Sequence, residues 1–90
     1  MIELQDYKGS IKYYSDVIKY TVKIEDSIIA YNNLGIAYRN LGELKIANEN
    51  LLLARELTKK NNDPRKVSLV LSNLGLVNAL LGNKEKGLAE

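Results

Sequence analysis

The 90-residue sequence contains neither cysteine nor histidine. Without cysteine, a disulfide framework and a thiolate metal site are both excluded, and this absence fits the reducing cytosol. Without histidine, the chain lacks the commonest general base and metal ligand that act near neutral pH. We therefore expect a cytoplasmic protein that uses no metal ion and no other cofactor.

The sequence also has little net charge, no long apolar run and no signal-like N-terminus. The formal net charge is only +2 and the lysines are spread along the chain, which gives little electrostatic attraction to nucleic acid. No apolar stretch approaches the ~18–20 residues of a membrane-spanning helix. The N-terminal MIELQDYKGS is acidic and polar, whereas a signal peptide begins basic and then becomes apolar. We expect neither a nucleic acid nor a membrane as the partner.

Proline occurs once, at Pro64, after three turn-forming residues in NNDP. The residue before a proline disfavours the α conformation, so a helix break is expected here. The dipeptide LG ends two apolar runs, and its glycines, Gly42 and Gly82, predict left-handed helix C-caps. Asp26 predicts the N-cap of a helix that begins at Ser27. These breaks divide the chain into about five helical segments: 3–22, 27–41, 43–60, 65–81 and 84–90.

Apolar residues within these segments recur at steps of three and four, a spacing typical of amphipathic helices. No segment shows sustained two-residue alternation, the pattern of a strand. The segment 27–41 places on one face Ile28, Tyr31, Leu34, Gly35, Tyr38 and Leu41. The segment 43–60 does the same with Leu44, Ala47, Leu51, Ala54 and Leu57. The expected fold class is therefore all-α, with antiparallel helical hairpins in a single domain or fragment over 1–90.

The chain repeats itself with an offset of 40 residues. The triplet Asn-Leu-Gly ending at Gly35 returns ending at Gly75, and the Leu-Gly pair ending at Gly42 returns ending at Gly82. Glycine inside a helix costs about 1 kcal/mol relative to alanine, and close approach of a second helix is the feature that makes this cost tolerable. The sequence therefore predicts that Gly35 faces Ala47 across the Gly42 turn.

The repeated unit resembles the tetratricopeptide repeat, a helix–turn–helix unit of about 34 residues with the pattern W-x2-L-G-x2-Y in its first helix. The positions that carry the resemblance are Tyr31 (in place of Trp), Leu34, Gly35, Tyr38, Gly42, Ala47, Leu51 and Ala54. The spacing of 40 is similar to that of longer-helix variants of the family. A further unit begins with Leu71, Leu74, Gly75 and Gly82. The stretch 4–18 resembles the second helix of an earlier unit, with Ser10, Tyr14 and Val17 in its packing positions.

The resemblance implies a right-handed superhelix, an α-solenoid, in which 3–22 is the second helix of a partial repeat. Residues 27–60 form the full repeat, and 65–90 form a truncated one. Two departures from the pattern would weaken packing in the last repeat. Asn78 aligns with Tyr38, and Gly87 aligns with Ala47. The family's first helices line a concave groove that binds peptides or partner segments. By alignment, the groove positions of the first full repeat are Ile29, Asn32, Asn33, Ile36, Arg39 and Asn40. Those of the next repeat are Leu69, Ser72, Asn73, Leu76, Ala79 and Leu80.

Asn33 and Asn73 are the leading candidates for binding, because a carboxamide offers both a donor and an acceptor to an extended peptide backbone. The alternative is that each amide bonds within the scaffold or to water. Ile36, Leu69 and Leu76 would add apolar pockets. The guanidinium group of Arg39 suits a ligand carboxylate, although the same residue also reads as a solvated surface arginine.

The segment 65–81 is apolar on nearly all sides, and such a helix is normally buried all round. The expected half-repeats at both ends leave it uncovered, so either the chain is part of a longer array or copies of it associate. Two functions from different classes therefore remain: a non-enzymatic scaffold that binds a protein or peptide in its groove, and a structural module that self-associates as a homodimer through 65–81. A regulatory segment of a larger signalling protein is compatible with either.

Catalytic and DNA-binding interpretations find little support in the sequence. The carboxylates Glu43, Glu49 and Glu56 are scattered over helical surface positions, and nothing pairs them in a cleft. The glycines of NLGIAYRNLG lack the spacing of a phosphate-binding loop and follow no strand. The same glutamates argue against a basic DNA-recognition helix over 43–57. We expect no enzymatic activity.

Overall fold

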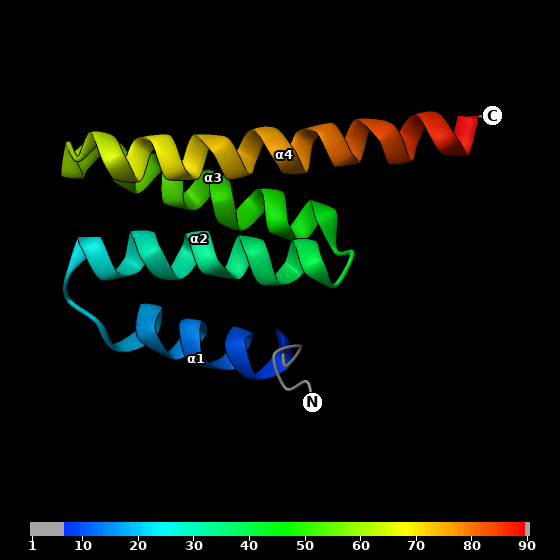
Figure 1. Ribbon diagram of the computed structural model, residues 1–90. Helices are drawn as coiled ribbons and strands as arrows, with labels where there is room; N and C mark the ends of the chain where they lie inside the picture. The colour runs from blue at the N-terminus through cyan, green and yellow to red at the C-terminus, as the bar shows by residue number, and fades with distance from the viewer. Residues whose placement is uncertain (1–6, 90) are drawn as a thin grey trace.

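The computed structural model describes the backbone of residues 7–89 and the side chains of residues 7–83. It contains four helices over this range: α1 (Tyr7–Tyr20), α2 (Ile24–Asn40), α3 (Leu44–Asn61) and α4 (Pro64–Ala89). Consecutive helices pack as antiparallel pairs, and α1 and α4 lie at opposite edges of the molecule (Figure 1). The expected all-α class is confirmed, with four helices in the described range in place of about five segments.

The core lies where α2, α3 and α4 meet. α3 contributes three side chains of which none is exposed to solvent, Ala47, Leu51 and Ala54. α2 adds Ile28 and Leu34, and α4 adds Val70, Leu74 and Val77. Tyr31 and Tyr38 are half-buried against this cluster. The repeat positions of the first full unit, apart from Gly42 in the turn, are therefore packing positions, as their periodicity predicts.

The turn between α2 and α3 is a left-handed helix cap at Gly42, whose φ is 84°. The Gly42 N–H donates to the Arg39 carbonyl at 3.0 Å, and the Glu43 N–H donates to the Tyr38 carbonyl at 2.9 Å. This pair of bonds satisfies carbonyl groups that the end of α2 would otherwise leave without partners. The predicted cap at Gly42 is confirmed, and it allows α3 to fold back onto α2.

The turn between α3 and α4 confirms the break predicted at Pro64. Asn62 ends α3 in the left-handed conformation, with a φ of 58°. Asp63 then caps α4, because its Oδ1 accepts the N–H of Arg65 at 3.0 Å. Pro64 is the first residue of α4, where its fixed φ suits the helix and no donor is required.

Asp63 also binds Lys66 Nζ through its Oδ2 at 2.9 Å. This hydrogen bond, together with that from the Arg65 N–H, holds the pKa of Asp63 below its ordinary value of 3.8. A carboxyl group whose pKa is lower in the folded state stabilises the fold above its unfolded pKa, and this contribution disappears as pH falls through the folded value.

We therefore expect Asp63→Asn, which keeps the cap but removes the charge, to lower the melting temperature at neutral pH. The difference from the wild type should shrink as pH falls below 3.8 and vanish in stronger acid, where Asp63 is protonated in both states. Thermal unfolding followed by circular dichroism across this range measures it. An equal difference at neutral and acid pH would contradict a role for the charge.

The predicted start of the second helix is wrong. α2 begins at Ile24, so Asp26 lies inside its first turn and does not cap a helix at Ser27. Thr21 organises the turn instead: its Oγ1 accepts the N–H of Lys23 at 3.1 Å and donates to Asp26 Oδ2 at 3.2 Å. The carboxylate of Asp26 is still favourable there, since negative charge in a first helical turn complements the helix dipole.

The predicted cap at Gly82 is also wrong, because α4 runs through this glycine without a break, and the segments 65–81 and 84–90 are joined up to Ala89. The local dipeptide is the same as at Gly42, but the residues that follow differ. The sequence after Gly42 supplies the apolar face of α3, whereas NKEKGLAE after Gly82 offers one large apolar residue, Leu88. A turn at Gly82 would lose helical hydrogen bonds and gain little burial, so the helix continues.

Gly35 does make the expected close approach, but with a different residue. A Cβ placed on Gly35 would lie 2.5 Å from Leu51 Cγ and 2.7 Å from Leu51 Cδ2, so its tightest neighbour is Leu51 and not Ala47. The large side chain occupies the space that glycine leaves open. At the repeated position, Gly75, a Cβ would meet no atom within 4 Å. The same glycine is thus covered in one repeat and open in the other.

Candidate binding surfaces

A groove runs between α1 and α2, and residues of both helices line it. One part is lined by Tyr7, Ser10 and Tyr14 of α1 and by Asn33, Ile36, Ala37 and Asn40 of α2. Three of the predicted groove residues, Asn33, Ile36 and Asn40, therefore do share one depression. We call this depression, together with the one described next, the α1–α2 groove.

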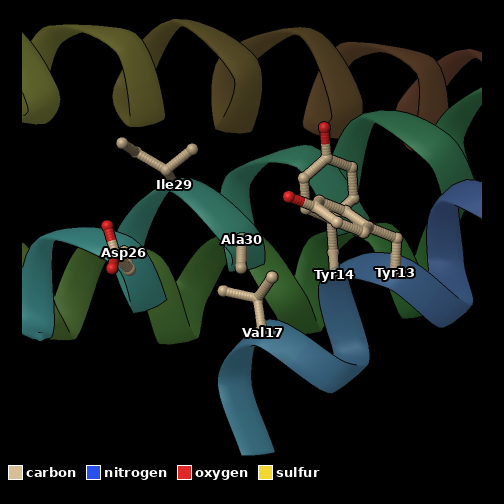
Figure 2. A pocket seen from close by; sticks show the side chains of 6 residues that line it. All are labelled: Tyr13, Tyr14, Val17, Asp26, Ile29 and Ala30. Atoms are coloured by element: carbon tan, nitrogen blue, oxygen red, sulfur yellow. The ribbon is translucent and has the colours of Figure 1, made fainter. Parts of the chain in front are cut away.

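The second part of the α1–α2 groove shares Tyr14 with the first, and Figure 2 shows the residues that line it. It is lined by Tyr13, Tyr14, Val17, Asp26, Ile29 and Ala30. The rings of Tyr13 and Tyr14 meet edge to face, with centroids 5.0 Å apart. Because Ile29 and Tyr13 are 43% and 62% exposed, the groove presents apolar surface that nothing in the described chain covers.

Asn73 is not available to a ligand in the way the sequence suggests. Its Nδ2 donates to Asn32 Oδ1 at 2.9 Å, a bond that joins α4 to α2. Asn32 is only 2% exposed, so the position predicted to line an open groove is buried. A buried amide oxygen needs a donor, and Asn73 supplies it. Of the two readings of Asn73, bonding within the scaffold is therefore what the structure has.

Asn73→Ala is expected to lower the free energy of unfolding by about 0.5–1.5 kcal/mol, because the Asn32 oxygen loses its donor. Asn78→Ala, at an exposed position one turn later in α4, is the matched control and should change it by less than about 0.5 kcal/mol. Urea unfolding of both variants provides the comparison. Equal effects at the two positions would show that the amide pair does not stabilise the fold.

The other predicted site residues are separated from the groove. Leu69 and Leu76 are 48% and 45% exposed on α4, and neither lines the α1–α2 groove. Arg39 Nε and Nη2 lie 3.4 and 3.3 Å from Asn40 Oδ1 and donate to it. The structure thus brings together Asn33, Ile36 and Asn40, and it leaves Leu69, Asn73 and Leu76 on another helix.

A second open surface lies between α3 and α4. It is a pocket of about 530 Å³, which we call the α3–α4 pocket, lined by Arg55, Thr58, Lys59, Asn62, Pro64, Val67, Ser68 and Leu71. Leu71 is 48% exposed, and the basic side chains of Arg55 and Lys59 are both exposed. The buried face of α4 carries Val70 and Val77, so the leucines on its other sides remain uncovered.

Sequence reasoning missed the contribution of α1 to the groove, above all that of Tyr13 and Tyr14. The signal was the predicted packing set of this segment, Ser10, Tyr14 and Val17. These three residues line the groove. The residues assigned to packing are therefore the ones that surround the depression.

The described side chains form no group of three or more acidic, cysteine or histidine residues that is able to hold a metal ion. Within residues 7–89, none of the helices combines the length and the apolar character that crossing a membrane requires. Comparisons of the chain with protein-family models, with curated proteins and with solved structures find no match. The tetratricopeptide resemblance rests on the repeat residues themselves and stays a prediction.

Proposed function

We propose that the chain is a non-enzymatic scaffold of the tetratricopeptide type, which binds a segment of a protein partner in the α1–α2 groove. The observation that carries the proposal is the shared depression at Asn33, Ile36 and Asn40 beside Tyr14. It combines an aromatic and an aliphatic wall with two carboxamides. Binding sites for peptides commonly join apolar contact area to a few polar groups that fix orientation.

The helical-hairpin packing supports the proposal. α2 and α3 form a hairpin closed by Gly42, and α4 packs beside α2 through the Asn32–Asn73 bond, as the first helix of a following repeat would. This packing supports the proposal that the chain is a short segment of a right-handed superhelix. The concave side of such a superhelix presents the exposed residues of its first helices to a partner.

Selection of binding peptides from a random displayed library, with the purified chain as bait, tests the proposal. The selected peptides should bind Ile36→Asp at least about tenfold more weakly than the wild type, which corresponds to about 1.4 kcal/mol. Asn33→Ala should weaken them less, because it removes one hydrogen bond. Leu53→Asp, at a residue of α3 outside the groove, is the control and should bind normally.

Circular dichroism of each variant confirms that it is folded before affinities are compared. A library that yields no binding peptide would count against the groove as a peptide site. Peptides that bind Ile36→Asp as tightly as the wild type would place their site elsewhere on the chain.

Self-association is the second candidate function, and a specific observation favours it. Four leucines of α4, Leu69, Leu71, Leu76 and Leu80, are between 36% and 48% exposed. Exposed apolar side chains gathered on one helix mark an interaction surface more often than scattered single ones do. A second copy of the chain is the simplest partner that would bury them.

A further inference from the structure

The α3–α4 pocket is related by the internal repeat to another pocket of the chain. A pocket between α1, α2 and α3 is lined by Ile18, Ser27 and Tyr31, and α3 lines its other side with Leu53, Glu56 and Leu57. Forty residues later, the first three positions are Thr58, Val67 and Leu71. These three residues line the α3–α4 pocket. The chain therefore contains corresponding pocket residues twice, once partly covered by the following helix, α3, and once without such a helix.

The covered copy shows which kind of helix fits the open one. α3 covers the first pocket, and α1 corresponds to α3 at the same offset of 40 residues. At this offset Tyr13 stands for Leu53, Asp16 for Glu56 and Val17 for Leu57. A helix with the sequence of α1 thus presents an aromatic and an aliphatic side chain where α3 presents two leucines.

The α1–α2 groove is open for a matching reason. α4 packs on α2 through Asn73, which reaches Asn32. One repeat earlier, the position of Asn73 is occupied by Asn33, which lines the groove. The groove therefore lies where the first helix of a preceding repeat would pack. α4 is a helix of this type, and its residue equivalent to Asn32 is the exposed Ser72.

We propose that two copies of the chain join head to tail, with α4 of one copy in the α1–α2 groove of the next. In the same contact, α1 of the second copy covers the α3–α4 pocket of the first. This inference deepens the second candidate function, self-association, and rests on it; of the four exposed leucines of α4, the joint uses Leu71. Because α1 and α4 lie at opposite edges and do not contact each other in the described structure, one molecule cannot close this joint by itself (Figure 1).

The chemistry of the two surfaces is complementary. Tyr13 of the second copy would enter the α3–α4 pocket beside Val67 and Leu71, and both Tyr13 and Leu71 now expose about half or more of their surface, 62% and 48%. Asp16 of the second copy, which pairs with Lys12 at 3.2 Å within its own helix, would face a rim that carries Arg55 and Lys59, and Lys59 pairs with Glu56 at 3.2 Å. Opposite charges at the rim of an interface favour the correct register of association.

Gly75 gives the joint its close approach. At its repeat equivalent, Gly35, the side chain of Leu51 occupies the space beside the glycine. The residue equivalent to Leu51 in α1 is Ile11, and the space beside Gly75 is empty to at least 4 Å. Ile11 of the second copy would therefore pack on Gly75. A contact between two different surfaces does not close on itself in a dimer, so further copies can add at both ends.

Sedimentation velocity of the purified chain over a wide concentration range tests the joint. The wild type is expected to give an average mass that rises with concentration and passes beyond that of a dimer. Leu71→Asp blocks the α4 side, and Tyr13→Lys blocks the α1 side by placing a cation against Arg55 and Lys59. Each variant alone should stay monomeric, and an equimolar mixture should form a heterodimer, because each partner retains one intact surface.

Gly75→Leu provides a second block on the α4 side at a position where an added Cβ meets nothing within 4 Å in the single chain, and circular dichroism confirms that the variant is folded. Leu53→Asp is the matched control for Leu71→Asp, because both leucines are 48% exposed, and it should associate like the wild type. A wild type that stays monomeric at every concentration would overturn the proposal. The proposal would also be overturned if the wild type stopped at a dimer and the mixture of Leu71→Asp with Tyr13→Lys formed no heterodimer. That pattern belongs to a symmetric pairing of α4 with α4. A peptide and α4 would compete for the one α1–α2 groove, so either of these results would leave the groove open to a peptide, and the peptide selection tests that function separately.

Discussion

Leu51→Ala is expected to lower the free energy of unfolding by about 2–5 kcal/mol, the range measured when a fully buried leucine is truncated. Leu51 has no exposed surface and belongs to the cluster of buried residues that α2, α3 and α4 build together. Its removal leaves a cavity that three helices must collapse to fill. For a domain of this size the loss is a large fraction of the total stability.

Leu52→Ala is the control for this prediction, because Leu52 is the next residue of α3 and is 40% exposed. Urea denaturation of both variants, at a protein concentration that keeps the chain monomeric, gives the two free energies. Leu52→Ala should lower the free energy of unfolding by less than about 1 kcal/mol, because less apolar surface is removed from a buried site. Similar losses at the two positions would mean that Leu51 does not occupy the core.

The second large effect is expected at the two repeated glycines, in opposite directions. Gly75→Ala should raise the free energy of unfolding by about 0.5–1 kcal/mol, because alanine suits a helix better and meets no atom there. Gly35→Ala has the same helical advantage, but its Cβ would lie 2.5 Å from Leu51 Cγ. Overpacking of this kind typically costs about 1–3 kcal/mol, so Gly35→Ala should be less stable than Gly75→Ala by that amount.

The double variant Gly35→Ala with Leu51→Ala separates packing from other causes. Truncation of Leu51 frees the space that the new Cβ requires, so the two changes together should cost less than the sum of the single ones. The expected coupling is about 1 kcal/mol or more, within the range seen for residues in contact. Strict additivity in the urea experiment would show that Leu51 is not what excludes a side chain at position 35.

Much of the fold could be predicted from local sequence. Gly42 and Pro64 mark two of the three turns between the described helices, because a left-handed cap and a missing backbone donor are properties of single residues. The steps of three and four residues identified Ala47, Leu51 and Ala54 as the buried face of α3. Such features need no knowledge of the rest of the chain.

The predictions that were wrong depended on what lies elsewhere in the chain. Gly42 and Gly82 have the same neighbour on their N-terminal side, yet only Gly42 turns, because the residues after it form a helix that buries an apolar face. Likewise, the periodicity that placed Gly35 against the next helix could not decide between Ala47 and Leu51. The choice depends on how the two helices are rotated about their axes.

Only part of the candidate site could be predicted from the sequence. Repeat alignment placed Asn33, Ile36 and Asn40 on one face of α2, and the structure brings these three together. Alignment could not show that Asn73 would bond to Asn32, because this bond joins residues 41 apart and departs by one from the repeat offset. A side chain reaching from one helix to its neighbour follows the geometry of packing, which the spacing alone does not contain.

The central claim is that the two open surfaces of the chain fit each other, with Gly75 of one copy against Ile11 of the next. Because the sequence has no cysteine, single introduced thiols report this contact without background. A disulfide forms readily only when the two Cβ atoms lie within about 3.5–4.5 Å. Mild oxidation of an equimolar mixture of Gly75→Cys and Ile11→Cys should give a cross-linked heterodimer, whereas each variant alone should cross-link poorly. Efficient cross-linking of Gly75→Cys with itself, or none in the mixture, would contradict the account.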